Sequence, residues 1–393
     1  MLTMDRRSLL KGTGAGVLAS LVSTRAAFAA APTDNRLVLV FLRGGLDGLH
    51  ALAPFDDRDY RRLRPTLALG IGRHDNAPIP LGGTFGLHPS LAPLKALYDG
   101  GELLFVPAAS TRYRERSHFD GQNMLENGSG RPYGAEDGWL NRAILGLNGG
   151  DRRLGLALGP AVPLILQGPA RVRTWANSSL PQVDKDFLLR LASVYAQDPL
   201  FAEALHDASG ALRPDVDTSM VDQPLPRKDF LLSARAAADL LARDEGPRIA
   251  AMELPGWDTH FNQEQRLAGL LGTVAQGLLD LKAGLGDAWA RTTVMVVSEF
   301  GRTAAENGSR GTDHGTGGLA ILAGGAVRGG RIAGDWPGLA RLYEDRDVAP
   351  VNDYEAIFKA LLIGHLGLNQ ALVEDHVFPG NARTAPMDGL LRG

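Results

Sequence analysis

Residues 292–318 read TTVMVVSEFGRTAAENGSRGTDHGTGG. The first six letters form a short run of β-branched and apolar side chains, which predicts a strand buried on both faces. The run ends at Ser298 and Glu299, and the polar, glycine-rich loop that follows carries Asp313 and His314. Because ligands bind at the carboxyl ends of strands in open α/β sheets, we expect a functional site here; the alternative is a solvated turn.

Two other predicted strands end in residues of the same character. Residues 35–42, NRLVLVFL, lead into RGGLDG, where Asp47 is a candidate metal ligand or, alternatively, shapes a tight turn. Residues 248–254 lead into PGWDTH, where Asp258 and His260 can point to one side of an extended backbone. A carboxylate with an imidazole suits zinc, manganese or iron; the alternative is an aspartate N-cap with a structural histidine.

A further predicted strand, residues 103–108, leads to a helix expected to begin near Ser117 and to end near Glu126. We expect Ser117 to cap this helix, with Asp120 completing a capping box. A hydroxyl at the positive end of a helix dipole can serve as a nucleophile or simply as a cap. His118 is a candidate ligand, acid/base group or cap residue. Three arginines precede the helix and could bind a phosphate or sulfate: Arg112, Arg114 and Arg116.

The N-terminus has the pattern of an export signal. Arg6 and Arg7 are followed by Ser-Leu-Leu-Lys, then by a weakly apolar stretch and by residues 27–30, AFAA, a small-residue cleavage signal. The paired arginines favour the twin-arginine route over ordinary secretion. We therefore expect residues 1–30 to be a signal peptide for the twin-arginine export machinery, and the mature protein to be periplasmic or secreted.

Composition limits the function classes. The chain has 393 residues, 44% hydrophobic and 22% charged, with no cysteine and a formal net charge of -3. Thiolate ligands and cysteine nucleophiles are excluded. A mildly acidic chain without a basic run beyond its N-terminus argues against nucleic acid as a partner, and no mature stretch has the roughly 20 apolar residues of a membrane span. We expect one domain over residues 31–393, with residues 213–226 as a weak candidate boundary.

The remaining segments continue the alternation of helices and strands. Helices are expected over residues 91–98, 136–147, 183–208, 227–242 and 353–363, and over the stretch after residue 260, where leucines recur with a period near 3.6. Short strands are expected over residues 154–157, 162–167 and 319–323.

The order of these motifs resembles that of the alkaline phosphatase/arylsulfatase superfamily. More closely, the chain resembles a large bacterial family of twin-arginine-exported, sulfatase-like proteins known as a domain of unknown function. The motifs that carry the resemblance are VFLRGGLDG, RSHFD, GWDTH, SEFGRTAAENGSRGTDHGTGG and GDWPGL, and they span essentially the whole mature chain. The resemblance implies an alkaline-phosphatase-like α/β fold, with a mostly parallel central sheet sandwiched between helices, and a hydrolase-type site.

The resemblance also implies roles by position. By position, Asp47 matches the first metal-binding aspartate of the superfamily, and Ser117 matches its nucleophile. Asp258 and His260 match the paired ligands of one metal, and His314 matches the late histidine of that site. Glu299 would replace the aspartate of an Asp-His pair, and Phe300 stands where the histidine of that pair is expected. A second metal would therefore lose an imidazole, although Asp313 could compensate, so sites with one metal and with two metals stay equally open.

These observations predict a metal-dependent hydrolase of phosphate or sulfate esters that acts on an anionic small molecule or glycan. The expected cofactor is a divalent metal, zinc first, with manganese, magnesium, calcium or iron as alternatives. Two other interpretations stay open: a catalytically degenerate hydrolase fold that binds an acidic glycan or assists assembly at the cell envelope, and another metal-dependent enzyme such as a transferase or lyase. The hydrolase requires one coordination-sized cluster, expected to contain Asp47, Asp258, His260, Glu299 and His314.

Overall fold

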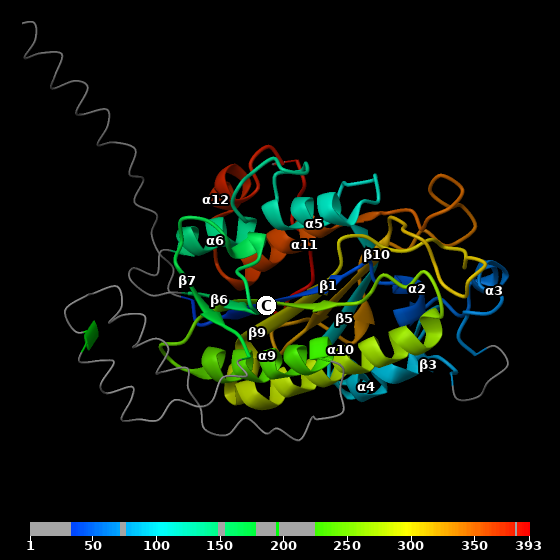
Figure 1. The fold of residues 1–393 in the computed structure, drawn as a ribbon, viewed down its shortest axis with the longest axis horizontal. Coiled ribbons are helices and arrows are strands. Elements are labelled where there is room, and N and C mark those ends of the chain that lie inside the picture. Colours follow the sequence, from blue (N-terminus) through cyan, green and yellow to red (C-terminus); the bar gives the residue numbers. More distant parts are fainter. Residues whose placement is uncertain (1–32, 71–75, 148–153, 178–193, 196–224, 382) are drawn as a thin grey trace, which may run out of the picture.

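The computed structural model describes residues 33–70, 76–147, 154–177, 194–195, 225–381 and 383–393. In this part of the chain, nine strands form one central sheet in the order β11-β5-β10-β9-β1-β8-β6-β7, with β12 beside β5 (Figure 1). The strands are β1 (Arg36–Arg43), β5 (Leu103–Ser110), β6 (Gly155–Leu158), β7 (Val172–Trp175), β8 (Ile249–Pro255), β9 (Thr292–Val297), β10 (Gly318–Ala323), β11 (Arg331–Ile332) and β12 (Asn352–Asp353).

Most neighbouring strands run parallel. β1 pairs in parallel with β8 and β9, β6 with β7 and β8, and β5 with β11 and β12. Only β10 is antiparallel within this described sheet, and it lies between β9 and β5. The expected mostly parallel α/β sheet is therefore confirmed, and the apolar runs at residues 35–42, 248–254 and 292–297 supply its three adjacent central strands.

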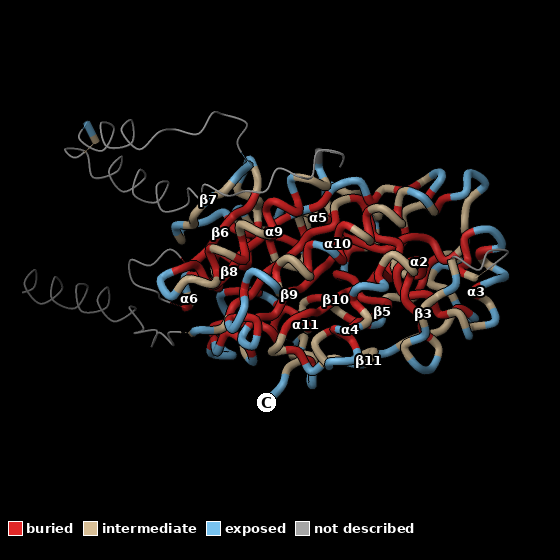
Figure 2. The backbone as a smooth tube through the Cα atoms, turned by 90° about the horizontal axis from the view of Figure 1, so that it is seen from below, coloured by how far each residue is buried: buried red, intermediate tan, exposed pale blue. Residues whose placement is uncertain are grey.

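Helices cover both faces of the sheet (Figure 1). On one side lie α4 (Lys95–Asp99), α9 (Leu225–Ala242) and α10 (Gln263–Leu285); on the other lie α5 (His118–Asn127), α6 (Trp139–Leu147), α11 (Tyr354–Ala360) and α12 (Gln370–Leu372). Val38 and Val40 of β1 belong to the core on the first side. Leu37 and Leu39 belong to the core on the other, because successive strand residues face opposite ways. Figure 2 shows the buried interior that results.

Shorter elements surround this sandwich. They are α2 (Gly48–Ala51), α3 (Arg58–Leu63), the 3₁₀ helices η1 (Pro89–Leu94) and η3 (Gly286–Arg291), the π-helical stretches η4 (Leu361–His365) and η5 (Val373–Val377), and a small antiparallel sheet of β2 (Leu52–Ala53), β4 (Gly86–Leu87) and β3 (Ile79–Pro80). Among the described residues, no helix is long and apolar enough to cross a membrane.

Some expectations for single elements need correction or cannot be compared. The strand expected over residues 162–167 is wrong, because that segment contains the 3₁₀ helix η2 (Leu164–Leu166). Pro163, which precedes it, has no N–H to donate to a sheet. The helix expected over residues 183–208 and the boundary at 213–226 lie outside the described residues, apart from 194–195 and 225–226.

Candidate metal centre

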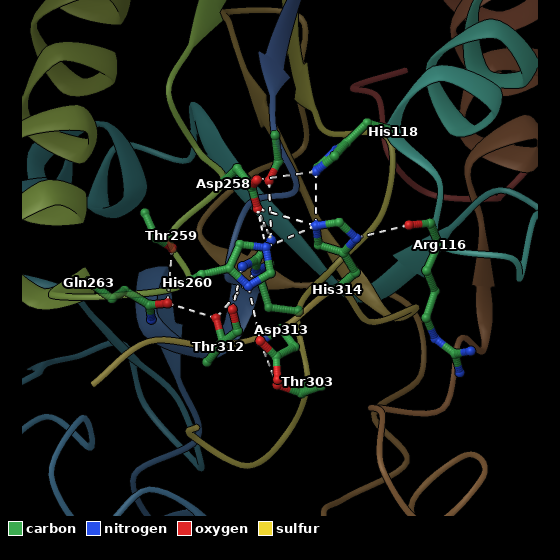
Figure 3. A network of polar contacts seen from close by, with 12 residues as sticks. Arg116, His118, Asp258, Thr259, His260, Gln263, Thr303, Thr312, Asp313 and His314 are labelled. Atoms are coloured by element: carbon green, nitrogen blue, oxygen red, sulfur yellow. Dashed lines mark hydrogen bonds and ion pairs between the residues drawn. The ribbon is translucent and has the colours of Figure 1, made fainter. Parts of the chain in front are cut away.

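The candidate site lies at the edge of the sheet where β1, β8 and β9 end. β8 runs into Asp258 and His260, and β9 runs into Glu299. Because β10 is antiparallel to β9, the loop that precedes β10 and carries His314 lies at the same edge. α5 begins there with His118. Segments far apart in the sequence therefore bring their polar side chains together (Figure 3).

Three imidazole rings converge at this edge (Figure 3). The Nε2 atom of His314 lies 3.0 Å from Nε2 of His118 and 3.1 Å from Nε2 of His260. The carboxylate of Asp258 joins them: Oδ1 is 2.9 Å from Nε2 of His260 and 3.3 Å from Nε2 of His314. Oδ2 of Asp258 is 3.6 Å from Nε2 of His118. We call these three histidines and Asp258 the histidine cluster.

The outer nitrogen of each ring faces an oxygen. The Nδ1 contacts are His118 to Glu299 Oε1 at 2.7 Å, His260 to Asp313 Oδ1 at 2.9 Å, and His314 to the backbone carbonyl of Arg116 at 2.9 Å. Because ionised carboxylates and carbonyls only accept hydrogen bonds, each Nδ1 donates. A neutral ring then directs the lone pair of Nε2 into the cluster. Facing lone pairs repel one another unless a proton or a metal ion lies between them.

The charges of the cluster agree with this arrangement. Burial opposes the ionisation of Glu299, but hydrogen bonds from His118 and Gln122 hold its pKa below the usual range. Burial also opposes the charged form of His118, yet the hydrogen bond and charge of Glu299 raise its pKa. Burial, and then the charge of His118, lower the pKa of His314. The surroundings therefore favour the protonated form of His118 more than that of His314.

The donor set fits a divalent metal. His118, Asp258 and His314 each offer one ligand atom, and these atoms lie within 4.8 Å of one another, a grouping found once in the described part of the chain. Histidine nitrogens and a carboxylate oxygen are usual ligands of zinc in catalytic sites. Ligating histidines usually donate their other N–H to a carboxylate or carbonyl, as these rings do. His260 stands beside this group, in contact with both Asp258 and His314.

Asp258 is fixed from behind by a buried arginine. Nη1 of Arg302 donates to Oδ1 of Asp258 at 2.7 Å, and the Arg302 side chain is fully buried. Burial opposes the ionisation of Asp258, but the hydrogen bond from Arg302 leads the contacts that lower its pKa. The carboxylate is therefore ionised at neutral pH, as a ligand must be.

The expected acids Glu299 and Asp313 contact the rings from outside. Glu299 is buried, and besides His118 it accepts from the backbone N–H of Gly44 at 2.8 Å and from Nε2 of Gln122 at 3.0 Å. Asp313 accepts from Nδ2 of Asn307 at 3.2 Å and from His260. The hydrogen bond from His260 is the main cause that lowers the pKa of Asp313. Both acids orient histidines in this arrangement.

Asp47 belongs to a different network. Its Oδ2 accepts from Nη1 of Arg64 at 2.7 Å and from the amide of Gln263, and its Oδ1 accepts from the backbone N–H of His50 as the N-cap of α2. Burial opposes its ionisation, but Arg64 lowers its pKa. Both carboxylate oxygens are thus engaged by protein donors, and the contacts of Asp47 within the described residues do not include the histidine cluster.

Ser117 and Arg116 lie just before α5. Ser117 is the N-cap, as expected, but its side chain makes no capping hydrogen bond. The expected capping box is wrong, because Asp120 accepts from the hydroxyl of Tyr113 at 3.2 Å instead. The Arg116 side chain contacts Asp347 at 2.9 Å and also Glu344, while its backbone carbonyl faces His314. Arg116 thus contacts the cluster through its backbone.

Phe300 packs against the cluster. Its ring centroid is 4.8 Å from that of His118 and 5.2 Å from that of His314, and the side chain is buried. The residue after Glu299 therefore offers apolar packing against the histidines and no atom that could bind a metal.

The sequence pattern assigned no role to Gln122, and it marked Arg302 only as one of several polar residues in the loop after β9. Gln122 is four residues after His118, so helical spacing places both on one face of α5, and this signal was present in the sequence. Arg302 lies in the long polar loop after β9, and nothing in its spacing distinguishes it from Arg310 of the same loop.

The family model "Protein of unknown function (DUF1501)" matches residues 108–375, more than half of the chain. None of the curated proteins compared with the chain matches it.

Several solved structures are similar at low identity. A protein in the alkaline phosphatase superfamily from Vibrio parahaemolyticus is 12% identical, with 98% of this chain and 80% of that chain covered and a TM-score of 0.38. The PsFucS1 sulfatase from Pseudoalteromonas sp. is 14% identical, with 91% and 74% covered and a TM-score of 0.37. A TAB5 alkaline phosphatase mutant with Mg bound is 13% identical, with 76% and 93% covered and a TM-score of 0.35.

Proposed function

The chain belongs to the DUF1501 family, and we propose that it is a metal-dependent hydrolase of phosphate or sulfate esters. One observation carries the proposal: His118, His314 and Asp258 offer ligand atoms within 4.8 Å of one another, while the outer nitrogens of the rings are held by oxygens. Such a site stabilises one divalent cation. When bound, this cation polarises the ester and stabilises the charge that develops on its oxygens.

The ligands we propose are His118, Asp258 and His314, with His260, which contacts the last two, completing the set. Glu299 and Asp313 orient His118 and His260, and Asp47 stabilises the fold behind the site. We propose zinc as the metal, because the donors are mostly imidazole nitrogens. Phe300 supports a site with one metal, since it offers no ligand at the position where a second site would need one.

Ser117 is the proposed nucleophile. It lies at the N-terminus of α5, beside the ligand His118, and its hydroxyl is not used in capping the helix. The free backbone N–H groups of the first turn of α5 favour an anionic group at this place. Attack by Oγ on the phosphorus or sulfur would release the alcohol and leave an ester on Ser117, which water would then hydrolyse.

We further propose that residues 1–30 are a twin-arginine signal peptide and that residues 31–393 fold as one exported domain. The support is the pair Arg6-Arg7 followed by residues 27–30, AFAA. An exported ester hydrolase would meet anionic glycan esters outside the cytoplasm, and we propose these as substrates.

The test begins with metal analysis of the natively exported protein beside a His314→Ala variant. We expect close to one equivalent of zinc in the wild type and a loss of most of it in the variant, because the three remaining ligands hold it less tightly. His376→Ala, which changes an exposed histidine, should keep the metal.

The loaded protein is then offered 4-nitrophenyl phosphate and 4-nitrophenyl sulfate. Turnover that Ser117→Ala abolishes without loss of metal would support the hydrolase and its nucleophile. A metal-free wild type would favour the glycan-binding alternative. Bound metal without turnover of either ester would favour another metal-dependent reaction.

A further inference from the structure

A second, buried polar network lies beside the histidine cluster (Figure 3). Its centre is the side-chain amide of Gln263, at the start of α10, which is fully buried. Nε2 of Gln263 donates to Oδ2 of Asp47. Oε1 of Gln263 accepts from the hydroxyl of Thr312 at 2.7 Å and from the hydroxyl of Thr259 at 2.9 Å. Both ends of the amide are therefore used.

Thr312 connects this amide to Arg302. Nε of Arg302 donates to the Thr312 hydroxyl at 3.3 Å, and Nη2 donates to the backbone carbonyl of Thr312. Nη1 of Arg302 reaches Oδ1 of Asp258 at 2.7 Å. A continuous chain of hydrogen bonds thus runs from Asp47 through Gln263, Thr312 and Arg302 to Asp258.

The direction of every hydrogen bond in this chain is determined. Asp47 is ionised by its pairing with Arg64 and can only accept, so the NH₂ end of Gln263 must face it. The amide oxygen then faces the two threonines. The Thr312 hydroxyl has one proton, which goes to Gln263, so its lone pairs are left for Arg302. Reversing the amide would set its oxygen against the carboxylate of Asp47, which is costly where no water can enter.

Besides its contacts with the three histidines, Asp258 has one buried hydrogen-bond donor, Arg302. Its side chain is 44% exposed, so packing alone does not fix it, whereas the Arg302 side chain is fully buried. The other contact of Arg302 Nη1, with the carbonyl of Gly44, is long at 3.5 Å. The orientation of the guanidinium therefore rests mainly on Thr312.

We propose that Asp47, Gln263 and Thr312 are positioning residues that set the metal affinity of the histidine cluster by holding Arg302 against Asp258. The inference rests on the metal site of the proposed function. It gives Asp47 a role at a distance from the metal, through Gln263, in place of the role of a ligand. Partners of this kind, which orient a ligand without touching the metal, usually change metal affinity by about 10–100-fold when altered.

The two threonines provide a matched test. Thr312→Val and Thr259→Val each replace a buried β-branched residue by one of the same shape, and each removes one hydrogen bond to Oε1 of Gln263. Both positions also adjoin candidate site residues in the sequence. Only Thr312 contacts Arg302. The dissociation constant for Zn²⁺ is measured for the full chain by competition with a chromophoric chelator, and the denaturant midpoint is measured for the metal-free protein.

We expect Thr312→Val to weaken Zn²⁺ binding about tenfold and Thr259→Val to keep it within about twofold, while both shift the denaturant midpoint by a similar amount. Arg302→Lys serves as a second variant, because one ammonium cannot contact Thr312 and Asp258 as the planar guanidinium does; it too should weaken binding about tenfold.

The inference would be overturned if the two valine variants changed the affinity for Zn²⁺ equally. It would also be overturned if Thr312→Val and Arg302→Lys left the affinity unchanged. Neither result would contradict the proposed metal site. A wild-type protein that binds no Zn²⁺ would overturn both the inference and the proposed function.

Discussion

Among the charged neighbours of His118, Glu299 has the largest effect on its pKa. Their side chains meet at 2.7 Å, and Glu299 is the main cause that raises the pKa of His118 against the effect of burial. Glu299→Gln removes the negative charge and keeps the shape of the side chain. We expect the pKa of His118 in the metal-free protein to fall, because the amide no longer stabilises the imidazolium. The ring signal followed by NMR through a pH titration measures this.

Asp313→Asn is the control for that titration. Asp313 contacts His260, so its loss removes a carboxylate beside the histidine cluster and leaves the contact between His118 and Glu299 in place. The pKa of His118 should change far less in this variant. An unchanged pKa in Glu299→Gln would show that the ion pair does not set the charge of the ring.

The buried ring of Phe300 should contribute to the stability of the fold. The ring is 1% exposed and packs against His118 and His314. Phe300→Ala should lower the free energy of unfolding by about 3–5 kcal/mol, since the removal of a buried ring leaves a cavity. Urea unfolding of the metal-free protein measures the loss. Phe261→Ala, which truncates a ring that is 57% exposed, should cost much less; equal losses would contradict the packing described for Phe300.

At the scale of elements, the pair Asp47–Arg64 joins segments that the sheet alone does not hold together. Asp47 caps α2 at the end of β1, and Arg64 ends α3 and donates to the carbonyls of Thr303 and Ala304 after β9. Both side chains are fully buried. Asp47→Asn leaves the guanidinium without its charged partner in the interior. We expect the free energy of unfolding to fall by about 3–5 kcal/mol, measured by urea denaturation.

An exposed pair of the same kind controls for this. Arg62 and Asp59 lie on α3 with the same separation of 2.7 Å, but the Arg62 side chain is 65% exposed. Asp59→Asn should change the free energy of unfolding by less than about 1 kcal/mol, because water screens the pair. If Asp47→Asn also changed the free energy of unfolding by less than about 1 kcal/mol, the buried pair would contribute no more to stability than the exposed pair.

The strands were the elements that sequence predicted best. The run at residues 292–297 coincides with β9, and those at 35–42 and 248–254 differ from β1 and β8 by a residue at each end. Continuous apolar runs at the centre of a parallel sheet have this signature because both faces are buried. The segment at 162–167 has a similar apolar composition, but it is short and contains Pro163, which has no backbone N–H to donate to a sheet. It forms a 3₁₀ helix instead of a strand.

The site was predictable only in part, for a physical reason. Asp258, His260 and His314 meet because strand ends share one edge, and that follows from the order of the motifs. Asp47 is engaged by Arg64 and Gln263 instead of joining the cluster. These contacts arise from tertiary packing, which the spacing of residues in the sequence does not reveal. The sequence pointed to both Ser117 and His118 at the start of α5 but left His118 open between ligand, acid/base group and cap, whereas the geometry brings its ring into the cluster.

At the scale of the whole molecule, two buried histidines should make the fold sensitive to acid. His50 and His88 are both nearly inaccessible to solvent, with ring centroids 5.0 Å apart. Burial leads the causes that lower the pKa of His50 to about 4 and that of His88 to about 3. In the unfolded chain a histidine titrates near 6.5. Below that pH the unfolded state binds protons that the folded state does not, so stability is lost as the pH falls toward 4.

The loss of stability at acid pH should depend on His88. A histidine that stays neutral when folded lowers the free energy of unfolding by about 2 kcal/mol between pH 7.5 and pH 5, from its depressed pKa. In His88→Asn the new side chain can accept from the backbone N–H of Ser90, as Nδ1 of His88 does at 3.0 Å, but it does not titrate. Urea unfolding at both pH values should therefore show an acid-induced loss smaller by about 2 kcal/mol than in the wild type. His376→Asn, at an exposed histidine, should leave that loss unchanged, and an equal loss in His88→Asn would show that His88 is protonated in the folded protein.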